Sequence, residues 1–168
     1  GLFQHAVFTV PDFAVGYTTD DNARALIFTV LLEELGEESA QVRALATTYA
    51  AFLQFAFDPA RGCWRNFLSF DRRWLEGAGS EDSHGRALLA LGTCVGRSRR
   101  RSFQDWAGQL FHRALPGVTE FTSPRALALT LLGIHEYLLS LSGDRLAAQT
   151  RDALTARLRQ LFQQCATE

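Results

Sequence analysis

Two short acidic clusters hold most of the side chains in this chain that could do chemistry. The first spans residues 20–24 and the second spans residues 81–86, and in both an arginine followed by Ala-Leu comes after the acids. Paired carboxylates in a cleft suit glycoside chemistry, because one acid protonates the leaving oxygen while the other acts as base or nucleophile. A histidine beside them suits a general base, since its unperturbed pKa is near neutrality. The candidate catalytic residues are therefore Asp20, Asp21, Glu81, Asp82 and His84.

Other side chains near the two clusters suit ligand binding. An arginine that begins an otherwise apolar helix either pairs with a nearby acid or points to the mouth of a cavity. The sequence leaves both interpretations open for these arginines. Aromatic rings beside the clusters could offer a sugar a stacking surface. The candidate substrate-binding residues are Tyr17, Asn22, Arg24, Trp74 and Arg86.

The same clusters also have a purely structural interpretation as the starts of helices. Ser80 and Ser123 suit the N-cap position, where a hydroxyl accepts a hydrogen bond from a backbone N–H, and Pro124 suits the first helical position. Arg-Ala-Leu occurs a third time at residues 125–127, and capping by residues 123–125 accounts for this third copy of the repeated phrase. Capping does not account for the surplus acids of the first two copies.

The sequence predicts no metal and no cofactor. Glu81, Asp82 and His84 are close together, but their spacing does not match a metal-ligand motif. The chain contains no phosphate-binding glycine-rich loop, no serine nucleophile elbow and no HExxH motif.

Six helical segments alternate between two kinds, and this order predicts the architecture. Segments 23–35, 87–95 and 126–141 are apolar almost all round, which predicts helices buried on all sides. Each is followed by an amphipathic segment with apolar residues at helical spacing. We therefore predict an all-α fold, an α/α hairpin array of three inner and outer helix pairs. It forms an open solenoid or part of a closed toroid.

The longest connection, from Asp58 to Ser80, interrupts this helical pattern. Residues 63–70 and 72–76 are rich in aromatic residues and roughly alternate, which predicts a small β-hairpin. A loop of this length in a compact domain is more often functional than idle.

Composition bounds the remaining possibilities. A chain of 168 residues with 47% hydrophobic residues suits a single domain, residues 1–168, and the lack of methionine predicts a fragment of a longer chain. The net charge of −1 predicts no nucleic-acid partner, and the basic run 97–101 is interpreted as a solvated loop. No signal peptide and no membrane-spanning run is visible, so we expect a cytoplasmic protein.

Three stretches of the chain resemble a known family. Residues 16–26, 66–76 and 79–86 are similar to the helical domain that lies C-terminal to the catalytic domains of some bacterial family 4-type glycosyltransferases. That domain is similar to the (α/α)6 toroids of six-hairpin glycosidases, so the resemblance implies a partial toroid, or one completed by association. It also implies a carbohydrate context. In six-hairpin glycosidases the site lies at the N-terminal end of the inner helices, where the two acidic clusters are expected here.

Two functional hypotheses follow. The first is a carbohydrate-active module of a larger bacterial glycan-processing protein, which binds or processes a glycan at the N-terminal face of the inner helices. If it is enzymatic, it is glycosidase-like or part of a glycosyltransferase. The alternative is a non-catalytic scaffold that packs on a glycosyltransferase domain, as part of the parent polypeptide, or on a second copy. A protein-binding solenoid is a third, less favoured reading.

Overall fold

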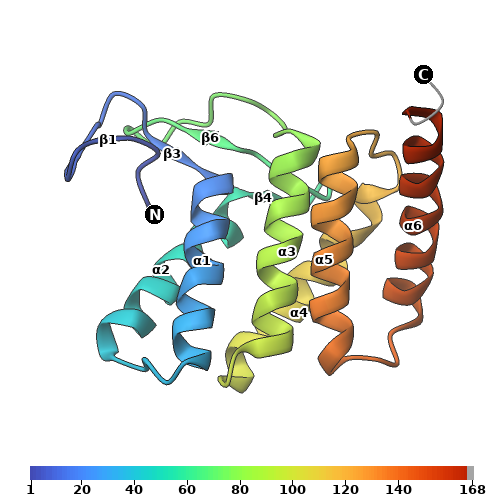
Figure 1. Cartoon of the computed structure of the whole chain (residues 1–168). Helices are drawn as coiled ribbons and strands as arrows, with labels where there is room; N and C mark the ends of the chain where they lie inside the picture. The colour runs from blue at the N-terminus through green and yellow to red at the C-terminus, as the bar shows by residue number, and fades with distance from the viewer. Residues whose placement is uncertain (166–168) are drawn as a thin grey trace.

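The computed structural model describes residues 1–165, and it confirms a mostly helical fold (Figure 1). Six α-helices lie in this part of the chain, one for each of the predicted helical segments. They are α1 (Thr19–Glu34), α2 (Ala40–Ala56), α3 (Glu81–Arg97), α4 (Arg101–Ala114), α5 (Pro124–Ser140) and α6 (Arg145–Cys165). A short 3-10 helix, η1 (Leu115–Val118), follows α4.

The helices begin where local capping chemistry predicts. The hydroxyls of Thr18, Ser80 and Ser123 accept hydrogen bonds from backbone N–H groups in the first turns of α1, α3 and α5. The carboxylate of Asp144 accepts from Ala147 N at 3.0 Å in the same way at the start of α6. The Ser39 hydroxyl likewise accepts from Val42 N at 3.2 Å at the start of α2, so five helix starts are fixed by side chains adjacent to them in sequence.

Helices α1, α3 and α5 lie side by side, with α3 in the middle (Figure 1). Ion pairs link α1 to α3 near both ends: Asp20 contacts Arg86 near the N-termini, and Glu34 contacts Arg97 near the C-termini. The two helices therefore run in the same direction. Helices α2, α4 and α6 each pack on the helix that precedes them.

Burial along these three helices differs from the prediction. The central helix α3 is buried over most of its length, as expected. In contrast, Phe28 on α1 is 61% exposed and Leu132 on α5 is 54% exposed. The expectation of three helices buried on all sides is therefore wrong for α1 and α5, because each has a neighbour on one side only in this row.

Helix α3 approaches α5 more closely than side chains with a Cβ would permit. A Cβ on Gly92 would overlap the carbonyl of Gly133, and a Cβ on Gly133 would lie 2.7 Å from the carbonyl oxygen of Leu88. Both distances are below the contacts that real Cβ atoms make, so glycine is required at both positions. The two backbones consequently touch directly at the middle of the helix row.

Glutamates from α1, α5 and the α1–α2 turn bind the basic run at the opposite end of the helix row. Arg97 makes two hydrogen bonds of 2.7 Å to the carboxylate of Glu136 on α5. Arg99 donates to Glu38 at 3.1 Å, and Arg100 lies 3.5 Å from the buried carboxylate of Glu33. The run therefore ties α3 and its following turn to α1, α5 and the α1–α2 turn, rather than forming a free solvated loop.

The predicted β-hairpin in the Asp58–Ser80 loop needs correction. Strand β5 (Cys63–Trp64) pairs with β4 (Phe57–Asp58), and β6 (Phe67–Leu68) pairs with β3 (Tyr17–Thr18). Within the loop, pairing between the two predicted strands is limited to the bridge of Leu68 with Trp74 and its flanking hydrogen bonds. The chain bends between β5 and β6 because Asn66 turns to the start of α1, so a continuous strand over 63–70 does not form.

The remaining strands, β1 (Ala6–Val7) and β2 (Val10–Pro11), pair with each other near the N-terminus. Among the helices that the structure describes, none is both long enough and apolar enough to cross a bilayer.

The glycine contact gives a direct stability test. Replacing Gly92 with alanine forces the Gly133 backbone away, and overpacking of this kind costs about 1–3 kcal/mol or more. Urea denaturation should show that loss in the free energy of unfolding. Gly108 on α4 is the matched control, because a Cβ there meets only a side-chain atom at 3.8 Å. Gly108→Ala should be neutral or stabilise by up to about 1 kcal/mol, since alanine favours helix. Equal effects of the two substitutions would contradict the proposed close contact.

Candidate functional site

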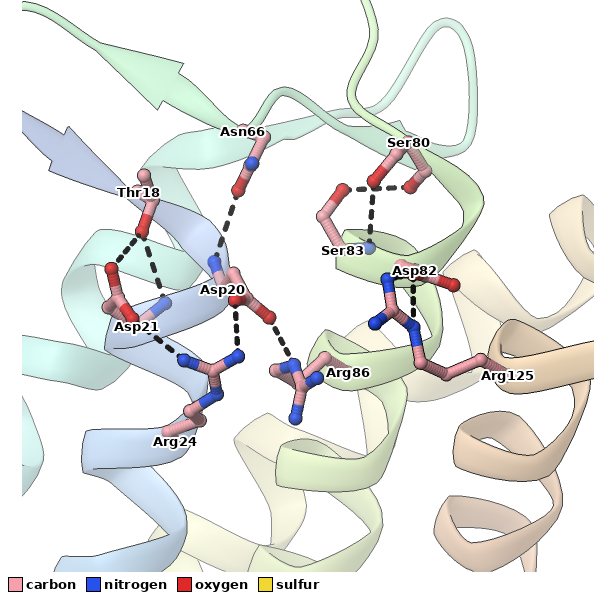
Figure 2. A network of polar contacts seen from close by, with 10 residues as sticks. All are labelled: Thr18, Asp20, Asp21, Arg24, Asn66, Ser80, Asp82, Ser83, Arg86 and Arg125. Atoms are coloured by element: carbon pink, nitrogen blue, oxygen red, sulfur yellow. Dashed lines mark hydrogen bonds and ion pairs between the residues drawn. The ribbon is translucent and has the colours of Figure 1, made fainter. Parts of the chain in front are cut away.

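The N-terminal ends of α1, α3 and α5 surround a small polar cavity of about 160 Å³ (Figure 2). Hydroxyl, amide, carboxylate and guanidinium groups line it. The lining residues are Asp20, Arg24, Asn66, Ser80, Asp82, Ser83, Arg86 and Arg125. Four of the ten predicted site residues, Asp20, Arg24, Asp82 and Arg86, are therefore brought together here.

Charged side chains of alternating sign form a row across the N-terminal ends of α1, α3 and α5. Arg24 contacts Asp20 at 2.7 Å and Asp21 at 3.0 Å, both within α1. The second carboxylate oxygen of Asp20 contacts Arg86 of α3. Figure 2 shows that Asp20 thus lies between two guanidinium groups from different helices.

A second ion pair continues this row to α5. Asp82, in the first turn of α3, pairs with Arg125 of α5 and also accepts a hydrogen bond of 3.0 Å from the Ser123 hydroxyl. The arginine–aspartate pairs therefore connect α1 to α3 and α3 to α5, with the cavity between them.

The Asp58–Ser80 loop fixes the position of Asp20 through Asn66. The side-chain oxygen of Asn66 accepts from Asp20 N at 3.1 Å. The backbone carbonyl oxygen of Asn66 accepts from Thr19 N at 3.0 Å. Glu76 in turn accepts from Asn66 N at 2.6 Å. These bonds satisfy backbone N–H groups that the first turn of a helix leaves unpaired. The long loop is therefore part of the wall of the cavity.

Electrostatics keep Asp82 ionised. The hydrogen bond from Arg125 is the main cause that lowers the pKa of Asp82, with further contributions from Ser123 and the charge of Arg86, against an opposing effect of partial burial. An ionised carboxylate accepts hydrogen bonds and cannot donate a proton. In this arrangement Asp82 is suited to ligand binding, or to a role as base, rather than to a role as general acid.

Glu81 and His84 lie outside the cavity. Glu81 accepts hydrogen bonds from the backbone N–H groups of Thr122 and Ser123 at 2.8 and 2.7 Å, so it anchors the segment before α5. His84 is almost fully buried and contacts Ala114 O through Nε2 at 3.1 Å. Because a carbonyl only accepts, Nε2 must carry the proton.

Aromatic rings enclose His84 and explain its charge state. The rings of Trp64 and Phe121 lie at 5.0 and 5.3 Å from the imidazole, each at a steep angle to it. Burial lowers the pKa of His84 to about 4, although the hydrogen bond to the Ala114 carbonyl acts in the opposite direction. His84 is therefore a neutral packing residue at neutral pH.

Four other predicted residues do not line the cavity. Asp21 pairs with Arg24 and with the Thr18 hydroxyl, and Asn22 binds the backbone of Leu2. The Tyr17 ring stacks on Phe3 at 4.4 Å. Trp74 packs on Phe55 of α2 at 5.4 Å and under the Arg65 guanidinium at 4.5 Å. The aromatic candidates thus belong to the packing of the N-terminal segment and the long loop.

Four lining residues are not among the predicted site residues: Asn66, Ser80, Ser83 and Arg125, of which Ser80 is predicted only as a helix cap. The signal for Arg125 is its place in the third copy of the repeated phrase, where capping alone accounts for the local sequence. For Asn66 the sequence offered only its position in the long loop. Both contact their partners across more than forty residues of sequence, and local patterns do not report such contacts.

Comparison of the chain with protein-family models, with curated proteins and with solved structures gives no match in any of the three. No cluster of three or more potential metal-ligating side chains occurs among residues 1–165. The arrangement of the site is therefore the basis for assigning a function.

Burial of His84 predicts a pH-dependent stability. Its folded-state pKa of about 4 is below the ordinary value of 6.5, so the unfolded chain binds the proton first as the pH falls. Stability should decrease between pH 6.5 and pH 4, by about 2 kcal/mol between pH 7 and pH 5. Urea denaturation at both pH values measures this change.

Substitution separates the contribution of His84 from that of other groups. His84→Gln should flatten the pH dependence in this window, whatever it does to stability at pH 7. His5→Gln, at an exposed position of the N-terminal segment, should retain it. A pH dependence that survives in His84→Gln would exclude His84 as its source.

Proposed function

We propose that the chain is a carbohydrate-binding module whose site is the cavity at the N-terminal ends of α1, α3 and α5. The observation that carries this proposal is the meeting of Asp20 and Asp82 with three arginines around one cavity. Carboxylate oxygens accept hydrogen bonds from sugar hydroxyls, and the planar guanidinium group donates several hydrogen bonds in a fixed direction. Such a lining suits a polyhydroxylated ligand better than an apolar one.

The geometry supports binding more strongly than hydrolysis. Glycoside hydrolysis needs a protonated acid beside the leaving oxygen. The acids that line the cavity are each paired with arginine, and the pKa of Asp82 is lowered. A hydrolytic version would require Asp20 or Asp82 to take up a proton next to a guanidinium group.

The helix arrangement supports the wider context of the proposal. Three parallel helices in a row, each followed by a helix that packs on it, suit half of an (α/α)6 toroid with its site at the inner-helix N-termini. Together with the resemblance of residues 16–26, 66–76 and 79–86, this favours a module of a bacterial glycan-processing protein associated with a glycosyltransferase domain.

Glycan-array binding followed by titration calorimetry tests the proposal. Asp20→Asn and Asp82→Asn each remove a charged acceptor, and a charge-assisted hydrogen bond is worth about 1.5–3 kcal/mol, so affinity should fall at least about tenfold. Asp152→Asn, on the exposed surface of α6, is the matched control and should bind as the unsubstituted chain does. Unchanged binding in both cavity variants would remove the site assignment.

A second candidate function is a non-catalytic scaffold that packs on another domain or a second copy. The observation that favours it is the exposure of large apolar side chains on α1 and α5. Under this interpretation the arginine–aspartate pairs are structural ties. Asp82→Asn would then lower the melting temperature without any change in glycan binding.

A further inference from the structure

Large apolar side chains form an exposed stripe on each of the two flanking helices. Phe28 and Leu31 on α1 and Leu35 at its C-cap, hereafter the α1 stripe, follow one another at helical spacing and are all exposed. On α5, Leu132 and Leu139 are two turns apart and 54% and 60% exposed, hereafter the α5 stripe. Monomeric soluble proteins rarely expose contiguous apolar surface of this kind without a partner.

The two stripes lie at matching positions along the helix axes, hereafter called height. Phe28 lies between the Asp20–Arg86 and Glu34–Arg97 contacts, which places it opposite the middle of α3, near Gly92. Gly92 in turn contacts Gly133 on α5, next to Leu132. Phe28 and Leu132 are therefore at the same height. Leu35 and Leu139 are also at the same height, about two turns nearer the C-terminal ends of the helices.

We propose that the chain forms a two-fold dimer in which the α1 stripe of each copy packs on the α5 stripe of the other. A two-fold axis parallel to α1, α3 and α5 preserves height, so it brings Phe28 to the partner's Leu132 and Leu35 to the partner's Leu139. Such an interface is isologous, and it forms twice in the same dimer. The proposal develops the second candidate function and does not depend on glycan binding.

A groove on α1 favours a second copy as the occupant. Apolar side chains from α1 and α2 line a groove of about 410 Å³, and Phe28 forms part of its wall. Ala25 and Leu32, on the side of α1 turned to this groove, are joined by Val42 and Leu45 of α2. An α5 stripe at the matching height would fill it with leucine side chains.

Charges at the N-terminal ends of α1 and α5 also face each other when the two-fold rotation is applied. Arg125 immediately precedes Ala126, which lies opposite Gly85 and so at the level of Arg86 and Asp20. The two-fold axis brings Arg125, whose side chain is 74% exposed, to the level of the partner's Asp21, whose carboxylate also contacts Arg24 of its own helix. In the proposed dimer, a contact between Arg125 and the partner's Asp21 would extend the row of acids and arginines from one copy to the next.

Light scattering coupled to size exclusion, over a range of protein concentrations, tests the dimer. The unsubstituted chain should show a dimer mass. Phe28→Asp and Leu132→Asp should each raise the dimer Kd at least about tenfold, because a charge replaces a central apolar contact. Leu75→Asp, at a similarly exposed position in the long loop, is the control and should remain dimeric. Circular dichroism confirms that the variants are folded.

Disulfide trapping tests the arrangement itself. In a background with Cys63 and Cys165 replaced by serine, mixing Phe28→Cys with Leu132→Cys should give a cross-linked heterodimer under mild oxidation. A monomeric mass at every concentration, or a dimer insensitive to both aspartate substitutions, would overturn the proposal. So would failure of the 28–132 cross-link in a chain that is dimeric. None of these outcomes touches glycan binding, which the Asp20 and Asp82 variants report separately.

Discussion

Direct backbone contact between α3 and α5 is the constraint on which the rest of the structure depends. Because Gly92 and Gly133 have no Cβ, the two helices come together without intervening side chains at their centre. Further contacts of the same kind occur at Gly85, against Ala126 O, and at Gly96, against Glu136 O. This proximity fixes the height of one helix against the other. It also brings the first turn of α3 within reach of the first turn of α5.

Ion pairs then hold the ends of the row that the glycines bring together. At the C-terminal ends Arg97 joins α3 to Glu136 of α5 and to Glu34 of α1. At the N-terminal ends the pairs formed by Asp20 and Asp82 make the same connections. The pairs at the N-terminal ends border a cavity that the Asp58–Ser80 loop closes through Asn66. The loop thus supplies a wall of the cavity in addition to the charged side chains.

Local chemistry made much of this fold predictable. The caps at Ser80 and Ser123 depend on residues three positions away, and the helical periodicity depends on residues within one or two turns. The alternation of helix kinds also identified the end of the fold at which Asp20 and Asp82 meet.

The individual roles of the acidic residues could not be predicted in this way. Glu81 and Asp82 are adjacent in sequence, yet one binds the backbone before α5 and the other lines the cavity. His84, one turn further on, is buried against η1 by residues thirty or more positions away. Successive helical residues point about 100° apart, so a single acidic cluster serves three neighbouring environments. The sequence pattern carries no information about which environment lies on which side.

The arginines at the N-terminal ends of the helices differ in solvent exposure. This difference decides how a ligand could enter the cavity without unfolding the first helical turns. Arg125 and Arg24 have side chains that are 74% and 54% exposed, and ion pairs at such positions contribute little net stability. Arg86 is only 19% exposed, so its contact with Asp20 is less screened by solvent. The two outer arginines can turn from their aspartates to a ligand at small cost, while Asp20 and Arg86 keep α1 and α3 in place. Under the proposed function, the same residues can then tie the helices together and still form hydrogen bonds with a bound sugar.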